Sequence, residues 1–214
     1  MQFSKLSLLI INRLENELPD NLTYHNAEHT KRVLEIAMQL ADAEGISDDE
    51  KTILATAALF HDTGFLVGNE KHEEHSCNIA REYLPEYEYS ASQIEEVCHL
   101  IMVTKNPQLA NNTLGKILCD ADLSYLGTDT FASISNNLYK ELKAVQNFSA
   151  IEMWPAKQVS FLKSHHYYTA AAQKQFGEKK EANLKALMKN YKYALKSDKP
   201  HDKGFLIQDF LLIA

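Results

Sequence analysis

The sequence has few of the residues that interrupt helices, and it has no long apolar run. Its 214 residues include only 7 glycines and 5 prolines, while 45% are hydrophobic, so turns are scarce and long helices are expected. No segment approaches the roughly 20 apolar residues of a membrane span. The apolar stretch 8–11 is too short for the core of a signal peptide and lacks a small-residue cleavage site. We therefore expect a soluble, cytoplasmic protein that does not associate with membranes.

The sequence also lacks an excess of basic residues and any closely spaced cysteine pair. The formal net charge is −7, which argues against broad nucleic-acid binding, because such binding needs clustered Lys and Arg. A small phosphorylated substrate remains compatible, since a metal ion can neutralise its charge. The cysteines Cys77, Cys98 and Cys119 form no CxxC motif. Their odd number within apolar patterns predicts buried, reduced thiols.

Apolar residues recur with helical spacing along most of the chain. The spacing predicts helices over residues 4–18, 27–44, 47–64, 70–84, 91–105, 113–126, 129–147, 155–176 and 178–196. Asn26 is the expected N-cap of the second helix, and two capping boxes are expected, Ser47 with Glu50 and Ser92 with Glu95. No alternating strand pattern exceeds four residues. The predicted fold is therefore an all-α helical bundle.

The chain also lacks a stretch rich in Pro, Gly or Ser that could serve as a linker. We therefore predict a single domain over residues 1–214. The motifs of this domain lie within residues 24–127. Further helices follow at 129–196, and an apolar tail occupies 204–214. This tail is apolar enough to need a partner surface, in this chain or in a second copy, so a homo-oligomer is one expectation.

Four polar residues stand on apolar helical stripes, where their side chains face the core. His29 begins one stripe, His61 and Asp62 end the next, and Asp122 lies on the inward face of a later helix. Burying one neutral polar group alone costs roughly 2–7 kcal/mol, and a shared metal ion removes this cost. Two imidazoles and two carboxylates suit a divalent cation with positions left open for water or substrate.

The neighbouring carboxylate Asp120 has a different expected position. It follows Lys116 by four residues, which suits an ion pair on the solvent side of the same helix.

Asp62, next to His61, can also bridge to a second ion, an arrangement that favours in-line attack on phosphorus.

The ordered set His29, His61-Asp62 and Asp122 resembles the His…His-Asp…Asp signature of the HD-domain superfamily of metal-dependent phosphohydrolases. One segment, LFHDTGF at 59–65, resembles the sequence around the His-Asp pair of this signature. Another, LCDADLSYLG at 118–127, resembles the sequence around its last ligand.

Two further segments carry related resemblances. YHNAEHT at 24–30 is similar to the Tyr-His-Asn-x-x-His segment of cyclic-nucleotide phosphodiesterases, which share the superfamily. Trp154 and residues 161–169 resemble the C-terminal helices of a bacterial subgroup of predicted HD phosphohydrolases.

The resemblance implies a function for each of these residues. His29, His61, Asp62 and Asp122 hold one or two divalent ions, drawn from Mg, Mn, Fe, Ni, Co and Zn. A metal-bound water is the nucleophile, Asp62 orients or deprotonates it, and His25 protonates the leaving oxygen. The implied substrate is a phosphoester of a nucleotide or of another small phosphorylated metabolite.

Members with a second fully ligated metal have further histidines between the His-Asp pair and the final Asp. His72, His75 and His99 are the candidates here, and His75 is favoured over His99 because it shares a helical stripe with apolar residues. Lys105 extends another stripe and is a candidate phosphate contact. For each of these residues a solvated surface position is the alternative.

Two other functions fit the same residues. One is an HD-fold diiron oxygenase, and the other is a non-catalytic protein that senses or binds nucleotides. The sequence leaves the metal, the number of ions and the substrate open.

Overall fold

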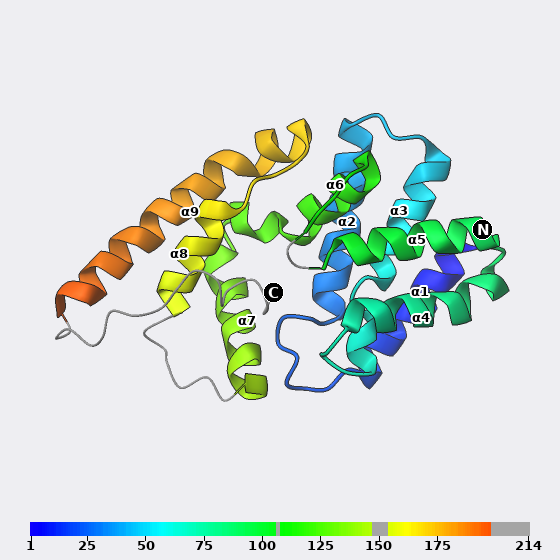
Figure 1. Ribbon diagram of the computed structural model, residues 1–214, viewed down its shortest axis with the longest axis horizontal. Helices are drawn as coiled ribbons and strands as arrows, with labels where there is room; N and C mark the ends of the chain where they lie inside the picture. Colours follow the sequence, from blue (N-terminus) through cyan, green and yellow to red (C-terminus); the bar gives the residue numbers. More distant parts are fainter. Residues whose placement is uncertain (106–107, 147–153, 198–214) are drawn as a thin grey trace.

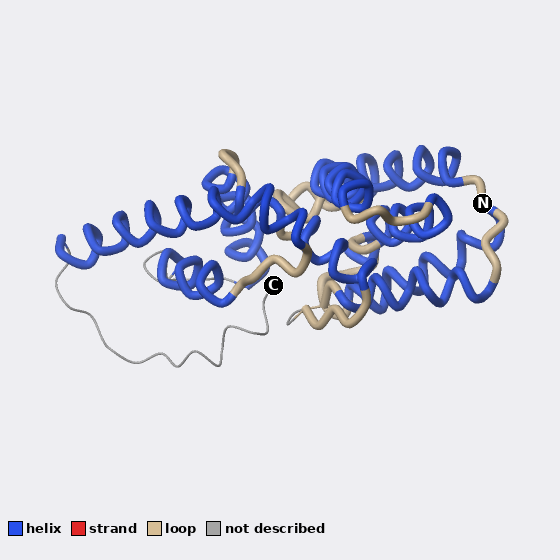
Figure 2. The backbone as a smooth tube through the Cα atoms, turned by 90° about the horizontal axis from the view of Figure 1, so that it is seen from above, coloured by secondary structure: helices blue, strands red, loops and turns tan. Residues whose placement is uncertain are grey.

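The computed structural model describes residues 1–105, 108–146 and 154–197. Across these ranges it contains nine α-helices, three short 3₁₀ helices and no strand (Figures 1 and 2). The all-α prediction is therefore confirmed. None of the helices in this part of the chain combines the length and apolar character that crossing a bilayer requires. The predicted apolar tail at 204–214 lies outside the described residues.

The helices form two groups that lie side by side (Figure 1). The first group contains α1 (Phe3–Glu17), α2 (Ala27–Ala43), α3 (Asp48–Phe60), η1 (Thr63–Leu66), α4 (His72–Tyr83), η2 (Leu84–Tyr87), α5 (Ala91–Val103), α6 (Thr113–Asp122) and η3 (Ser124–Gly127). The second group contains α7 (Phe131–Gln146), α8 (Trp154–Ser164) and α9 (Ala170–Ser197). The predicted boundaries agree closely with the first group and less well with the second.

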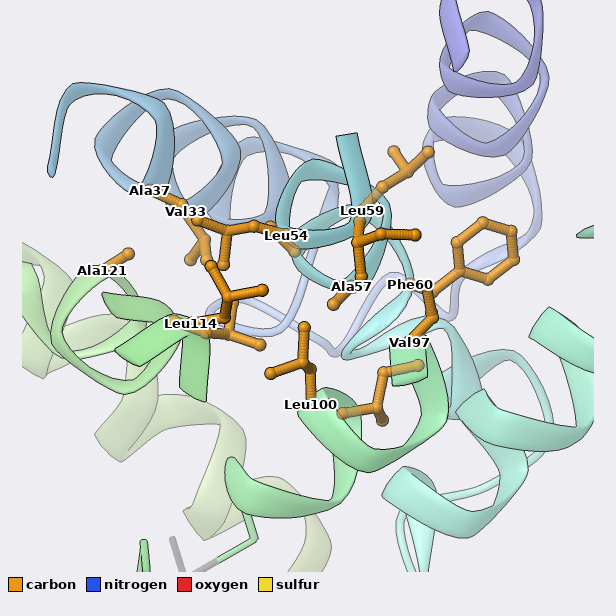
Figure 3. Packing of buried hydrophobic residues seen from close by; sticks show 14 of the residues in the cluster. Val33, Ala37, Leu54, Ala57, Leu59, Phe60, Val97, Leu100, Leu114 and Ala121 are labelled. Atoms are coloured by element: carbon orange, nitrogen blue, oxygen red, sulfur yellow. The ribbon is translucent and has the colours of Figure 1, made fainter. Parts of the chain in front are cut away.

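The main core fills the space between α2, α3, α5 and α6 (Figure 3). The last eight positions of α3 are all buried, from Ile53 to Phe60. Each fully buried Leu, Ile or Phe side chain stabilises the fold by roughly 1.5–3 kcal/mol. Because α3 is enclosed on every side, its C-terminal end is held in a fixed place, and His61 and Asp62 follow directly.

Polar caps fix where several helices begin. The Asn26 side chain accepts hydrogen bonds from the backbone N–H groups of Glu28 and His29, so the predicted N-cap of α2 is confirmed. Ser47 and Glu50 form the predicted capping box of α3.

The capping box of α5 differs from the prediction. It is formed by Ser90 and Gln93, whereas Ser92 and Glu95 were expected. Ser90 has the extended backbone that an N-cap requires, and Ser92 already lies inside the first helical turn. Glu95 instead pairs with Arg81 of α4.

The break between the last two helices also differs from the prediction. A break at Gly177 was expected, but α8 ends at Ser164 and α9 runs without interruption from Ala170 to Ser197. A glycine inside a helix costs only about 1 kcal/mol, which the packing of α9 against α8 and η3 offsets.

Two glycines permit the close contacts that bring elements to the site. A Cβ atom on Gly64 would overlap the carbonyl oxygen of His72, and one on Gly127 would overlap that of Phe176. Gly64 therefore lets α4 approach η1, beside Asp62. Gly127 lets α9 pack on η3, next to the end of α6.

Candidate metal centre and active-site cavity

Three helix ends bring nitrogen and oxygen ligands together. His29 comes from the first turn of α2, His61 from the residue after α3, and Asp122 from the last residue of α6. Their ligand atoms all lie within 4.8 Å of one another. Nε2 of His29 is 3.2 Å from Nε2 of His61 and 3.2 Å from Oδ1 of Asp122. The three side chains that helical periodicity directed inward therefore converge.

Asp62 adds a fourth ligand atom, an oxygen, to this cluster. Its Oδ2 lies 3.3 Å from Nε2 of His29 and 3.2 Å from Nε2 of His61, and this buried oxygen has no hydrogen-bond partner. Ligands about 2.1 Å from one ion lie roughly 3.0–3.4 Å apart at angles between octahedral and tetrahedral. Nε2 of His61 and Oδ1 of Asp122 are 3.8 Å apart, and the other separations lie within this range. Together with the orphaned oxygen they fit a divalent cation.

The two histidines are held by different contacts at Nδ1. Nδ1 of His61 lies 2.8 Å from the carbonyl oxygen of Ala58, so it donates there and leaves Nε2 free for a metal. Nδ1 of His29 lies 2.9 Å from Nη2 of Arg32. A guanidinium can only donate, so Nδ1 accepts this bond. Coordination through Nε2 then requires a proton on Nδ1 and a shift of Arg32.

Burial and charge act in opposite directions on these groups. Burial alone lowers the pKa of His61, but the negative charges of Asp62 and Asp122 outweigh it and raise the pKa to about 9. Burial alone raises the pKa of Asp62, yet the cationic His61 and the neighbouring His29 hold it well below its usual value. Without a metal the cluster therefore takes up protons, and a cation competes with them.

The structure corrects the predicted position of Asp120. This carboxylate is fully buried and forms no surface ion pair with Lys116. It accepts hydrogen bonds from the backbone N–H groups of Tyr168 and Thr169 at 2.7 and 2.8 Å, and from the Thr169 hydroxyl at 2.7 Å. The segment before α9 covers the last turn of α6. The backbone N–H groups of this segment have no partner within α9 and need an acceptor. Asp120 therefore anchors α9, while Asp122 belongs to the group of converging ligand atoms.

His25 lies beside the cluster and is held by an acid from the second group of helices. Its Nδ1 pairs with Oε1 of Glu141, a residue of α7 that is itself buried. The other carboxylate oxygen accepts from the backbone N–H groups of Tyr24 and His25 at 2.7 and 3.0 Å. Burial lowers the pKa of His25, but the bond to Glu141 and the charge of Asp62 raise it above its ordinary value.

A stack of three rings continues from His25 to α4. Phe65 lies between the rings of His25 and His72, with centroids 4.3 Å from each. Nε2 of His72 is 3.7 Å from Oδ1 of Asp62 and 3.6 Å from Oε1 of Glu73. His72 therefore faces Asp62 from the side opposite His29.

One cavity joins these groups to the second group of helices. It contains about 1240 Å³ of space, counting the part open to solvent. Its polar end is lined by His25, Asp62, His72, Glu73 and Asp122. Its other end is lined mainly by apolar side chains of α7 and α8, which include Leu138, Tyr139, Leu142, Trp154, Phe161 and Leu162. Trp154, at the start of α8, therefore borders the same cavity as the polar residues.

The further candidates named from the sequence lie elsewhere. His75 is half-buried on α4 and lies outside the group of converging ligand atoms. His99 is exposed on α5 and borders a separate hollow. Lys105 is exposed and bonds Glu74 at 2.8 Å. Among the candidate histidines between the His-Asp pair and Asp122, His72 is therefore the one placed at the cavity.

Sequence reasoning missed three residues of this site. Glu141 carries a signal that was available, because it lies three residues after Leu138 on the apolar stripe of its helix. Phe65 and Glu73 carry no comparable signal. Their positions follow from the close contact between η1 and α4, which the spacing of apolar residues does not reveal.

Comparison with known proteins agrees with this geometry. Residues 26–124 match the HD domain family. A predicted HD superfamily hydrolase from an uncultured Thermotogales bacterium is 21% identical, with a TM-score of 0.57, over 90% of this chain and 91% of that one. Bacillus subtilis YpgQ, solved in complex with ADP, is 21% identical, with a TM-score of 0.60, over 94% of this chain and 98% of that one. These likenesses show a shared fold. No curated protein matches the sequence.

Proposed function

We propose, from the match of residues 26–124 to the HD domain family, that the protein is a metal-dependent phosphohydrolase. Its proposed substrate is a phosphoester of a nucleotide or of another small phosphorylated metabolite. The observation that carries this proposal is the cluster of His29, His61 and Asp122 with the unpartnered Oδ2 of Asp62 beside it, at the polar end of a cavity. His29, His61, Asp62 and Asp122 are the proposed ligands of one divalent cation.

The bound cation would neutralise phosphate charge and make water a stronger nucleophile. Asp62 has a second oxygen, Oδ1, that faces His72 rather than the two ligand histidines. We assign this oxygen to orienting a water molecule on the cavity side.

His25 is the proposed proton donor. Because Glu141 holds its Nδ1 and raises its pKa, His25 favours the protonated form that a general acid needs. Its ring centroid lies 6.1 Å from that of His29, so the donor stands next to the metal ligands without belonging to them. A general acid in this position typically contributes about 10²–10⁴-fold to the rate.

The two unlike ends of the cavity support a substrate with a charged part and a flat, apolar part. A phosphate group fits the polar end beside the proposed cation. A base fits the apolar end, where the rings of Tyr139 and Trp154 lie 5.4 Å apart. The ADP bound by the YpgQ relative supports a nucleotide as the proposed substrate of this chain.

The test begins with the metal content of the purified protein. We expect about one or two divalent ions per chain by elemental analysis, and metal-dependent release of phosphate or pyrophosphate from a panel of nucleoside mono-, di- and triphosphates. His61→Ala should lose both metal and activity. His99→Ala serves as the matched control, because that histidine is exposed and remote, and it should retain both.

Three outcomes would replace this proposal. Iron with an O₂-dependent absorption spectrum and no phosphate release would identify an oxygenase. Tight ADP binding by the metal-loaded protein without turnover would identify a nucleotide sensor. If the His61→Ala variant were as active as the intact protein, the four proposed ligands would have no part in the reaction.

A further inference from the structure

The three cysteines occupy two different settings. All three are buried and unpaired, as the sequence predicts. Cys119 stands apart, with its Sγ 3.4 Å from the carbonyl oxygen of Val103. Cys77 of α4 and Cys98 of α5 instead face each other across two packed helices.

The contact between Cys77 and Cys98 is reciprocal. Sγ of Cys77 lies 3.5 Å from the carbonyl oxygen of Cys98, and Sγ of Cys98 lies 3.6 Å from the carbonyl oxygen of Cys77. Two residues satisfy both contacts only when they stand directly opposite each other where the helices cross. The small thiol side chains allow the close helix approach that disulfide geometry requires.

The surroundings favour a reaction at Cys98. The adjacent Cys77 thiol and the nearby Arg81 guanidinium lower the pKa of Cys98 despite its burial, and the adjacent Cys98 thiol raises that of Cys77. A hollow lined by Cys77, Cys98, Arg81, His99 and Met102 borders this pair. The hollow gives a small oxidant an approach to the pair, and the lowered pKa makes Cys98 the thiol that is more easily ionised.

We propose that Cys77 and Cys98 are a redox-active dithiol, which a peroxide converts to a disulfide between α4 and α5. This site is separate from the metal cluster. It does not depend on the proposed phosphohydrolase activity.

The reaction consumes one peroxide for each pair. The Cys98 thiolate attacks one peroxide oxygen, the O–O bond breaks, and hydroxide leaves, so that Cys98 becomes a sulfenic acid. The Cys77 sulfur then attacks the Cys98 sulfur. The S–S bond forms, the S–O bond breaks, and water leaves with the Cys77 proton. Two thiols are oxidised and one peroxide is reduced to two waters.

Peptide mapping of the full chain tests this proposal. The protein is treated with hydrogen peroxide, alkylated after denaturation, and digested with trypsin without reductant. Arg81 and Lys105 separate the three cysteines into different tryptic peptides. We expect a linked pair of peptides containing Cys77 and Cys98, two hydrogen atoms lighter than the sum of both, and an alkylated Cys119.

Single variants distinguish the roles of the two thiols. Cys77→Ser should stop the reaction at a Cys98 sulfenic acid, which dimedone traps, and Cys98→Ser should leave Cys77 reduced. Cys119→Ser is the matched control and should form the linked peptides at the original rate. The proposal is overturned if the intact chain yields no linked peptides, or if Cys119 oxidises as fast as Cys98. A circular dichroism spectrum confirms that each variant is folded.

Discussion

The two ends of the cavity are built in different ways. The polar end takes Asp62 and Asp122 from the ends of α3 and α6, in the group α1–α6 whose core encloses α3, and the buried His29 and His61 lie beside these carboxylates. The apolar end takes its side chains from α7 and α8. In the first region the ligand positions follow from a dense core. In the second they follow from how the later helices dock onto that core.

The two regions also differ in charge. Residues 1–130 contain 22 acidic and 9 basic residues, whereas residues 131–214 contain 7 acidic and 13 basic residues. The acidic part contains the four proposed metal ligands. Lys143 and Lys157 of the basic part also line the cavity.

Removing a metal ligand should have the largest effect. His61→Ala and Asp62→Ala should each lose the metal and essentially all metal-dependent phosphate release, because both groups face the same point from one helix end. Elemental analysis and a phosphate-release assay measure the two losses. Undiminished metal content in both variants would show that the polar end of the cavity is not a metal site.

The two aspartates of α6 provide the next test. Asp122→Asn should lose metal, because its oxygen lies beside both histidines. Asp120→Asn should keep the metal, and it should lower the free energy of unfolding by about 1–3 kcal/mol, since buried hydrogen bonds to the segment before α9 are weakened. Urea unfolding and elemental analysis separate the two effects. If only the Asp120→Asn variant lost the metal, Asp120 would be the ligand and Asp122 the structural residue.

His25 tests the link between the two regions. His25→Ala should retain the metal and slow the hydrolysis of esters with poor leaving groups by about 10²-fold or more. An activated ester such as p-nitrophenyl phosphate needs little protonation and should suffer less. Equal losses on both esters, or loss of metal, would make His25 a ligand or a structural residue.

The pair of His25 and Glu141 should also make stability depend on pH. The pKa of His25 is raised from 6.5 and that of Glu141 is lowered from 4.5. The charged pair therefore stabilises the fold fully between these two ordinary values, and the stabilisation fades as pH rises through the raised pKa of His25. Glu141→Gln should then cost more unfolding free energy near pH 6 than near pH 9, by urea titration. A penalty independent of pH would reduce Glu141 to a neutral hydrogen-bond acceptor.

The smallest effect is expected at the apolar end. Trp154→Ala should raise KM for nucleotides by about 2–10-fold through lost ring contact. It should leave hydrolysis of p-nitrophenyl phosphate nearly unchanged. Steady-state kinetics on both substrates measure the difference. If hydrolysis of both substrates were impaired equally, Trp154 would maintain the shape of the whole cavity and would not act by contacting a base.

The sequence by itself determined the helical fold and the inward direction of the four proposed ligands. Helical periodicity fixes which way a side chain points relative to its own helix, and His29, His61, Asp62 and Asp122 each stood on or beside an apolar stripe. The adjacency of His61 and Asp62 also needed no tertiary information. These residues were found because each signal lies within one helix.

Only the tertiary structure decided the partners that come from distant elements. Glu141 meets His25 across 116 residues, and Asp120 is buried because a later segment covers its helix. The phase of a helix says which residues share a face, but it does not say whether solvent or another chain segment lies against that face. For this reason the convergence of the four proposed ligands was predictable, whereas the pairing of His25 with Glu141 and the anchoring of α9 by Asp120 depended on packing.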